Sequence, residues 1–240
     1  MQQQQAGFFL LDKPVGPTSF KMVHLVKRIL QIKKIGHAGT LDPFASGLLI
    51  ICVGRNATKR ISLLMDGEKE YSATLKLGIE TDTQDLTGEV VGRREVAGIT
   101  AEMVERCLQS FIGEQLQAPP AFSALKYKGK PLYYYARKGI KVAKDPRTVF
   151  IREIEALGLQ DDLLRIRVIC GKGTYIRTLA ADIGRKLGCG AHLVELRRLR
   201  SGLYSVDEAL PGDRLVGDRE DDYQLLLQYL RPVDDIVAGC

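Results

Sequence analysis

The chain lacks the cysteine and histidine spacing that metal sites and disulfide frameworks require. Its five cysteines include no CxxC pair, and its three histidines show no metal-ligand spacing. An odd number of scattered cysteines predicts neither a disulfide framework nor a zinc site. We therefore expect no metal and a reducing, cytoplasmic setting. The cysteines are Cys52, Cys107, Cys170, Cys189 and Cys240.

Long apolar runs are absent as well. No apolar segment approaches the roughly 20 residues that a helix needs to cross a bilayer. The start of the chain, Met1 followed by Gln2 to Gln5, lacks the basic-then-apolar order of a secretion signal. We expect no membrane contact and a flexible N-terminus over residues 1–6.

The charge balance is moderately basic. Lys and Arg number 35 against 29 Asp and Glu, which gives a formal net charge of +6. This excess favours polyanionic partners, although an ordinary basic protein fits the charge equally well. With 240 residues and 45% hydrophobic content, the chain can bury the core of one large domain or two small ones.

The apolar pattern predicts short strands with helices placed irregularly between them. We expect strands at 8–11, 48–53, 68–79, 148–157 and 163–170, and helices from Thr18 or Ser19, from Thr100 to about Gly113, at 176–187 and at 223–230. The alternation in 68–79 places Tyr71 first in the inward-facing set. Strands joined by short turns favour an α+β fold over a doubly wound sheet.

One carboxylate stands in a loop of restricted geometry, Gly36–Gly47. Glycines there permit close backbone approach, and Pro43 biases Asp42 toward extended geometry. The apolar run 48–53 follows, so Asp42 lies at the entrance to a buried strand. Such a carboxylate is directed before any substrate arrives, as a nucleophile requires. An Asx-type turn, in which Asp42 bonds its own backbone, is the alternative.

This loop resembles the catalytic motif of the TruB family of tRNA pseudouridine synthases. The family pattern of Gly-His, a small residue, Gly, two residues and Asp-Pro is met from Gly36 to Pro43. Ordered blocks over roughly residues 7–235 are far more specific than one short motif. The other blocks are Leu11–Pro14 with Gly16, Thr18 and Ser19, Lys69–Tyr71, Gln117–Pro120, Ser123–Lys126, Gly171–Arg177, Cys189–His192 and Leu196–Arg198.

The resemblance implies a fold and an activity. The fold is the pseudouridine synthase fold, an α+β fold with a mixed, largely antiparallel sheet, flanking helices and an RNA-binding cleft, here as one catalytic domain over 7–235. The activity is isomerisation of uridine to pseudouridine at position 55, in the TΨC arm of tRNA, without cofactor or metal. Bacterial members commonly continue into a C-terminal PUA-type domain, which we expect to be absent from this chain.

The resemblance also implies roles for single residues. Asp42 is the nucleophile and Arg177 pairs with it. Tyr71 stacks on the flipped base and is also a catalytic candidate, which could abstract a sugar proton in the glycal route. The route stays open between attack of Asp42 on C6, attack on C1′, and elimination to a glycal. Tyr175 and Leu196 match residues that line the base pocket.

Other candidates concern the RNA around the target base. His37 resembles the histidine that takes up the space of the flipped nucleotide, whereas His192 is expected to be structural. Candidates for RNA backbone contacts are Lys13, Lys126, Lys128 and Lys130. The last three belong to a basic and aromatic segment, for which a solvated helix face is an equal alternative. The same ambiguity applies to Arg197, Arg198 and Arg200.

Two other classes of function fit parts of the sequence. A non-catalytic protein that binds or folds tRNA would need the cleft but not Asp42. A glycosidase-like enzyme that releases the base would need two working acids, and no second acid stands out. A monomer is the expected oligomeric state.

Overall fold

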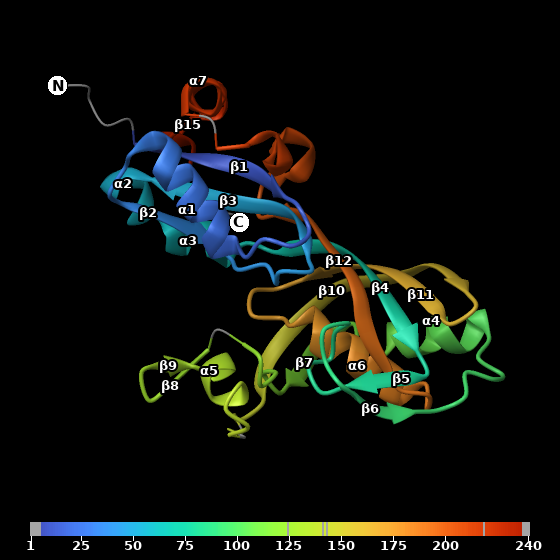
Figure 1. Ribbon diagram of the computed structural model, residues 1–240. Coiled ribbons are helices and arrows are strands. Elements are labelled where there is room, and N and C mark those ends of the chain that lie inside the picture. The colour runs from blue at the N-terminus through green and yellow to red at the C-terminus, as the bar shows by residue number, and fades with distance from the viewer. Residues whose placement is uncertain (1–5, 124, 141, 143, 218, 237–240) are drawn as a thin grey trace. The chain divides into compact units, whose positions relative to one another are not determined.

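The computed structural model describes residues 6–123, 125–140, 142, 144–217 and 219–236 (Figure 1). The chain forms two compact units, one made of the residues up to Tyr71 together with those from Leu196 onward, the other of Ser72–Glu195. The N-terminal residues 1–5, expected to be flexible, and Cys240 lie outside the described residues. The single catalytic domain expected over 7–235 stays a prediction.

The first unit is built on an apolar sheet. Its sheet order runs β14-β1-β3-β12, with β2 and β15 paired to β3 and β1 respectively and β13 to β12. The elements are β1 (Gly7–Lys13), α1 (Ser19–Leu30), β2 (Ile35–Ala38), β3 (Ser46–Val53), α2 (Gly54–Thr58), α3 (Ile61–Asp66), the start of β4 (Lys69–Leu77), the end of β12 (Ala191–Ser201), β13 (Tyr204–Ser205), a 3-10 turn at Val206–Glu208, β14 (Leu210–Pro211), a 3-10 turn at Gly212–Arg214, α7 (Arg219–Tyr229), β15 (Arg231–Pro232) and a 3-10 turn at Val233–Asp235.

The core of this unit forms where β1 and β3 meet. Phe8 and Leu10 of β1 and Leu48 and Ile50 of β3 are fully or almost fully buried in one hydrophobic cluster. The Phe8 ring packs edge-on against Tyr204 at 5.3 Å between ring centroids. Strands β1 and β3 are antiparallel neighbours. Because successive side chains of a strand point to opposite faces of the sheet, every second side chain enters this cluster.

Helix α1 covers the same unit and begins as the sequence predicts. Thr18 caps it by accepting from the backbone N–H of Lys21 at 3.0 Å. Met22, Val26 and Ile29 are buried at helical spacing. The helix ends at Leu30, beyond which Gln31 takes the left-handed conformation with φ 53°.

The second unit carries the longest strand pair. Its sheet order runs β4-β11-β10-β7, and β5 with β6 and β8 with β9 form separate two-stranded sheets. Its elements are most of β4, β5 (Ile79–Thr81), β6 (Val90–Arg93), α4 (Ala101–Gln109), β7 (Gly113–Gln117), β8 (Lys126–Tyr127), β9 (Lys130–Pro131), α5 (Leu132–Ala136), β10 (Arg147–Gln160), β11 (Leu163–Cys170), α6 (Ile176–Lys186) and the start of β12.

These elements confirm the α+β prediction. The strands expected at 8–11, 48–53, 148–157 and 163–170 are β1, β3, β10 and β11, and the sheet mixes antiparallel pairs with the parallel pairs of β1 with β14 and β3 with β12. The 68–79 strand was predicted too long, because Gly78, with φ 81°, ends β4 before Ile79.

Some expectations were wrong in detail. Helix α4 ends at Gln109 and not near Gly113. Strands β2 and β12 were not predicted. Among the described residues, no helix is long and apolar enough to cross a membrane.

Candidate active site

The Asp42 loop joins β2 to β3 in the first unit. Asp42 is half-buried, between the buried Leu41 and the exposed Pro43. The backbone N–H of Ala45 donates to the Asp42 carbonyl at 3.1 Å, which closes a tight turn around Pro43. Asp42 therefore lies in a short, folded turn just before the buried strand β3, where the loop sequence predicts it.

One side of this loop is held by the start of α1 and the residues just before it. The buried hydroxyl of Ser19 accepts from the N–H of Leu41 at 2.9 Å and donates to the Leu41 carbonyl at 3.0 Å. The N–H of Gly16 donates to the Pro43 carbonyl at 2.8 Å. Hydrogen bonds thus hold the residues on both sides of Asp42.

Lys13 reinforces the same contact from inside the protein. Its ammonium donates to the carbonyls of Pro14 and Pro17, both at 2.8 Å, and reaches that of Pro43 at 3.4 Å. The side chain is fully buried. The predicted contact of Lys13 with an RNA phosphate does not fit this burial, because carbonyl oxygens already surround the ammonium. Lys13 instead supports the Asp42 loop.

The charge of Lys13 is coupled to Asp42. Desolvation lowers the pKa of Lys13 from 10.5 to about 8, and the negative charge of Asp42 acts in the opposite direction. This attraction is mutual, so the Lys13 ammonium favours the ionised form of the carboxylate.

Arg198 of β12 holds the other side of the loop. Its side chain is 2% exposed, its Nε donates to the Leu48 carbonyl at 2.7 Å, and its Nη2 donates to the Gly39 carbonyl at 3.1 Å. Gly47 has φ 101°, and a Cβ there would lie 2.2 Å from the Arg198 carbonyl oxygen. Only glycine permits this approach of the two backbones.

His37 lies in β2 and not in the loop itself. It pairs with Ile51 of β3, and its ring is only partly exposed. Burial lowers the pKa of His37, the charge of Arg198 lowers it further, and the backbone of Gly39 opposes both. His37 is therefore neutral near pH 7.

Tyr71 and Leu196 also belong to the first unit. Tyr71 is 9% exposed in β4, and Leu196 is 8% exposed in β12. Both therefore keep a small accessible surface. The arginines beyond Leu196 have structural partners: Arg197 forms a two-point ion pair with Asp12 at 2.7 and 2.9 Å, and Arg200 bonds Glu70 at 3.2 Å. These ion pairs account for Arg197 and Arg200 without an RNA contact.

Arg177 lies in the second unit, near the start of α6. It is 4% exposed, its Nη1 donates to the Thr83 carbonyl at 3.1 Å and lies 3.3 Å from Asp85 Oδ2, and its Nη2 donates to the Phe122 carbonyl at 2.7 Å. The guanidinium is therefore directed by three acceptors. The expected pairing of Arg177 with Asp42 joins residues of different units and stays a prediction.

Asp85 was not recognised from the sequence. It is 4% exposed, and its Oδ1 accepts from the Thr83 hydroxyl at 2.7 Å and from the Thr87 N–H at 2.9 Å. These bonds orient the carboxylate so that Oδ2 faces Arg177. Its buried ion pair joins residues 92 apart in sequence, a contact that no local pattern reveals.

The start of α6 is held by β7. The buried Gln117 side chain accepts from the Tyr175 N–H at 2.7 Å and donates to the Tyr175 carbonyl at 3.1 Å. This two-point contact holds the backbone of Tyr175, the N-cap of α6, next to Arg177. It gives the Gln117–Pro120 block a structural purpose that the sequence could not assign. His192, as expected, is structural, with Nδ1 2.9 Å from the Ile79 carbonyl.

The basic and aromatic segment forms a hairpin followed by a short helix. Lys126, Lys128 and Lys130 are exposed on β8, the turn and β9. The Lys130 ammonium lies 4.3 Å from the centre of the Tyr134 ring. These cations belong mainly to a hairpin, so the alternative of a solvated helix face does not describe them.

Metal-binding groups are not gathered in the part of the chain that the structure describes. No three His, Cys, Asp or Glu side chains there are placed to hold an ion.

Family models cover nearly the whole chain. Residues 27–176 match that of the TruB family pseudouridylate synthase (N terminal domain), and residues 177–238 match that of the tRNA pseudouridylate synthase B C-terminal domain. The chain belongs to the TruB family. All the candidate residues except Lys13 lie within the two matched regions.

Curated TruB relatives are similar over most of their length. The chain is 55% identical to "tRNA pseudouridine synthase B" of Desulfotalea psychrophila, covering 98% of each protein. It is 48% identical to the protein of that name from Aromatoleum aromaticum, over 97% of this chain and 74% of the relative. The family members are isomerases, and so is this chain.

Solved structures agree with the TruB assignment. The chain is similar to one in a Cbf5-Nop10-Gar1 complex, with a TM-score of 0.73 and 31% identity over 98% of this chain. It is also similar to one in an H/ACA RNP bound to a substrate RNA containing 2'-deoxyuridine, with a TM-score of 0.70 and 28% identity. The chain spans 62% and 61% of the length of those two proteins. These likenesses confirm the pseudouridine synthase fold.

Proposed function

We propose that this TruB-family protein converts uridine to pseudouridine at position 55 of tRNA, in the TΨC arm, with Asp42 as nucleophile and the target base flipped out of its stack. The names of the relatives support a tRNA substrate. The observation that carries the catalytic assignment is the Asp42 loop, which hydrogen bonds hold at Leu41, Pro43 and Gly39.

The reaction balances without any co-reactant. The N1–C1′ bond breaks, the base turns, and a C5–C1′ bond forms. The proton lost from C5 and the proton gained by N1 compensate each other, and nothing is oxidised or reduced. One carboxylate can assist by attack on C6 or C1′, or by elimination to a glycal. We therefore propose no cofactor and no metal.

Asp42 must be ionised to act as a nucleophile. A free aspartic acid, with a pKa of about 3.9, is ionised near pH 7, but an RNA that fills the site desolvates it. The buried ammonium of Lys13 opposes this loss of charge from within the same unit. We propose that Arg177 supplies a second cation on substrate binding. Its guanidinium, already oriented by Thr83 and Asp85, needs no reorganisation.

Flipping the base requires surfaces that compensate for lost stacking, which costs a few kcal/mol. We propose Tyr71 as the stacking ring, with Tyr175 and Leu196 lining the pocket. Tyr71 and Leu196 are 9% and 8% exposed, which leaves each a small accessible edge for contact with a base. A neutral His37 can enter the space left in the RNA without carrying an unpaired charge into it.

The basic hairpin suits the RNA backbone. Lys126, Lys128 and Lys130 are exposed and stand beside tyrosine rings, a makeup that fits phosphates and unstacked bases. We propose that they contact the tRNA around the target arm. A cytoplasmic location and a monomeric state complete the proposal.

Primer extension over carbodiimide adducts tests the function directly. An unmodified tRNA transcript is incubated with the unaltered protein, with Asp42→Asn, or with Asp213→Asn, which changes an exposed aspartate and serves as the control. We expect a new stop at the T-loop uridine with the unaltered and control proteins, and a rate lower by about 10³-fold or more with Asp42→Asn.

Other outcomes identify the competing functions. Release of free uracil would indicate a glycosidase-like enzyme. Tight tRNA binding with no stop in any RNA would indicate a binding or folding protein. A stop of equal strength with Asp42→Asn would remove Asp42 from the chemistry.

A further inference from the structure

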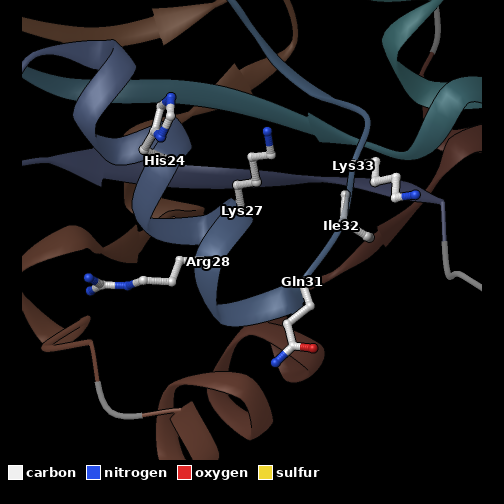
Figure 2. Close-up of a pocket in the computed structure, with 6 residues that line it drawn as sticks. All are labelled: His24, Lys27, Arg28, Gln31, Ile32 and Lys33. Carbon is white, nitrogen blue, oxygen red and sulfur yellow. The ribbon is translucent and has the colours of Figure 1, made fainter.

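Helix α1 carries a row of basic side chains that no step above uses. Lys21, His24, the adjacent pair Lys27 and Arg28, and Gln31 are each three or four residues from the next, so they lie on one side of the helix. All five are exposed. Figure 2 shows Lys27 and Arg28 projecting from α1, with Lys33 on the segment that follows it. We name Lys21, His24, Lys27, Arg28 and Lys33 the α1 basic surface.

The surface surrounds a shallow hollow. His24, Lys27, Arg28, Gln31, Ile32 and Lys33 line a volume of about 370 Å³ (Figure 2). Only Ile32 among them is buried. The hollow therefore presents amino, guanidinium, imidazole and amide groups, which are hydrogen-bond donors suited to an anion.

The positive charge of this surface is not balanced within its own stretch of sequence, although α7, which begins with acidic residues, packs against α1. Residues 13–41 contain six Lys or Arg and no Asp or Glu. In the described part of the chain, no carboxylate forms an ion pair with any residue of the α1 basic surface. Two other arginines show the contrast: the exposed Arg94 pairs with Glu80 at 2.7 Å, and the half-buried Arg231 pairs with Glu208 at 2.8 Å.

Helix stability explains only part of the charge. Lys27 and Arg28 lie in the last turn of α1, where cations favour the helix dipole by about 0.3–1 kcal/mol. Lys21 lies in the first turn, where a cation is unfavourable, and Lys33 lies beyond the helix. The dipole therefore accounts for two of these residues and not for the surface as a whole.

An exposed ring stands beside the charges. Phe20 is 64% exposed and lies 4.3 Å from the His24 ring, centroid to centroid. One exposed apolar residue means little alone. Together with an unbalanced basic row, it gives the mixture of cations and rings that nucleic-acid surfaces use.

The α1 basic surface begins on the first turn of the helix whose first residue holds the Asp42 loop. Ser19, which holds Leu41 on both its N–H and its carbonyl, is the first residue of α1, and Lys21 follows two residues later. From Lys21 to Gln31 the row rises about 15 Å along the helix. An RNA placed at Asp42 can therefore continue along this row.

We propose that the α1 basic surface binds the phosphate backbone of a double-stranded segment of the substrate RNA, next to the segment that holds the reacting uridine. RNA duplexes are recognised through backbone and shape more than sequence, which an exposed basic row can do. The proposal names a second contact of the same site and rests on the proposed function for the identity of the RNA.

A charge-matched pair of variants tests the surface. The test variant is Lys27→Gln, Arg28→Gln and Lys33→Gln together; the control variant is Arg55→Gln, Lys59→Gln and Arg106→Gln, which removes the same charge from other exposed positions. For each protein, the Kd for tRNA and for a plain RNA duplex is measured from low to moderate salt, with the single-turnover rate at saturating tRNA.

We expect the test variant to bind tRNA and duplex about tenfold or more weakly at low salt. Its slope of log Kd against log salt should fall by roughly 0.7–0.9 for each phosphate that the variant no longer neutralises. The saturated rate should change less than twofold, and the control variant should behave as the unaltered protein.

Any one of three results would overturn the proposal: a salt slope of the test variant equal to that of the unaltered protein, an equal loss of binding in the control variant, or a fall in the saturated rate with no change in binding. Failure of the proposed function can be told apart from failure of this proposal. In that case the unaltered protein makes no pseudouridine, and the Kd values for the RNA duplex still test whether this surface binds RNA. All six substituted side chains are exposed, and equal unfolding midpoints confirm that the variants fold.

Discussion

Arg198 and Gly39 are joined across the Asp42 loop by a hydrogen bond of 3.1 Å, from a guanidinium that is almost fully buried to a backbone carbonyl. The same guanidinium bonds the Leu48 carbonyl at the other end of the loop. A buried arginine thus connects the start of the loop to its end, and its charge adds to the effect of burial in lowering the pKa of His37.

Arg198→Met should therefore loosen the loop. It leaves two carbonyls without their donor, at about 1–3 kcal/mol for each buried group. We expect the free energy of unfolding to fall by about 2–5 kcal/mol, and kcat to fall more than tRNA affinity. Urea unfolding and single-turnover rates measure both. Arg200→Met, which breaks a more exposed pair, is the control and should cost about 1 kcal/mol or less. Equal losses in the two variants would contradict this role for Arg198.

Asp85→Asn should affect Arg177 from within the second unit. The amide keeps the shape but removes the charge that faces a buried guanidinium, and breaking such a pair costs about 3–5 kcal/mol. We expect lower stability and lower turnover. Thermal and urea unfolding measure the first, and pseudouridine formation the second. Glu80→Gln, made in an exposed pair with Arg94, should change stability by about 1 kcal/mol or less. Full activity in Asp85→Asn would show that Arg177 is oriented without it.

The lowered pKa of Lys13 predicts that the stability of the protein depends on pH. Its pKa is about 8 in the folded protein, against 10.5 for a free lysine side chain. Between these values the unfolded chain binds more protons, so the free energy of unfolding rises with pH. Below pH 8 both states are protonated and the trend stops. Urea unfolding of the unaltered protein and of Lys13→Met, from pH 7 to 10.5, should show the unaltered protein gaining relative to the variant. A constant difference between them would refute the shifted pKa.

The lowered pKa of Tyr134 predicts an early step in the absorbance titration of the tyrosines. Hydrogen bonds from Lys138 and Lys130 lower the pKa of its phenol to about 8. Absorbance at the phenolate band should therefore show one tyrosine ionising near pH 8, ahead of the usual range near 10. Tyr134→Phe should remove this step, and Lys130→Gln should move it to higher pH. If bound tRNA covers the hairpin, the step should shift on addition of tRNA.

The sequence predicted the elements that carry local signals. Thr18 and Thr100 cap the helices expected from them, and the apolar run after Asp42 is the buried strand β3. These predictions succeed because helix capping and strand alternation depend on residues that are close together in the sequence. Strand β2 is too short and too rich in glycine to be recognised this way.

The support of the active-site loop could not be predicted, because it depends on contacts between distant residues. Arg198 reads as one of three surface arginines, yet it is buried because β12 lies beside β3 in parallel, with Arg198 opposite Gly47. The sequence alone suggests that Lys13 is a surface cation, yet it is the last residue of β1 and is buried like most of that strand. In both cases the partners are backbone carbonyls, which carry no sequence signature.

The double contact of Pro43 with Gly16 and Lys13 has a consequence for engineering. A relative's Asp42 loop grafted alone onto this chain would meet a foreign set of donors, and its carboxylate would be misplaced even with every motif residue present. Residues 13–19 and 39–48 should be exchanged together, as one cassette, with Arg198 kept.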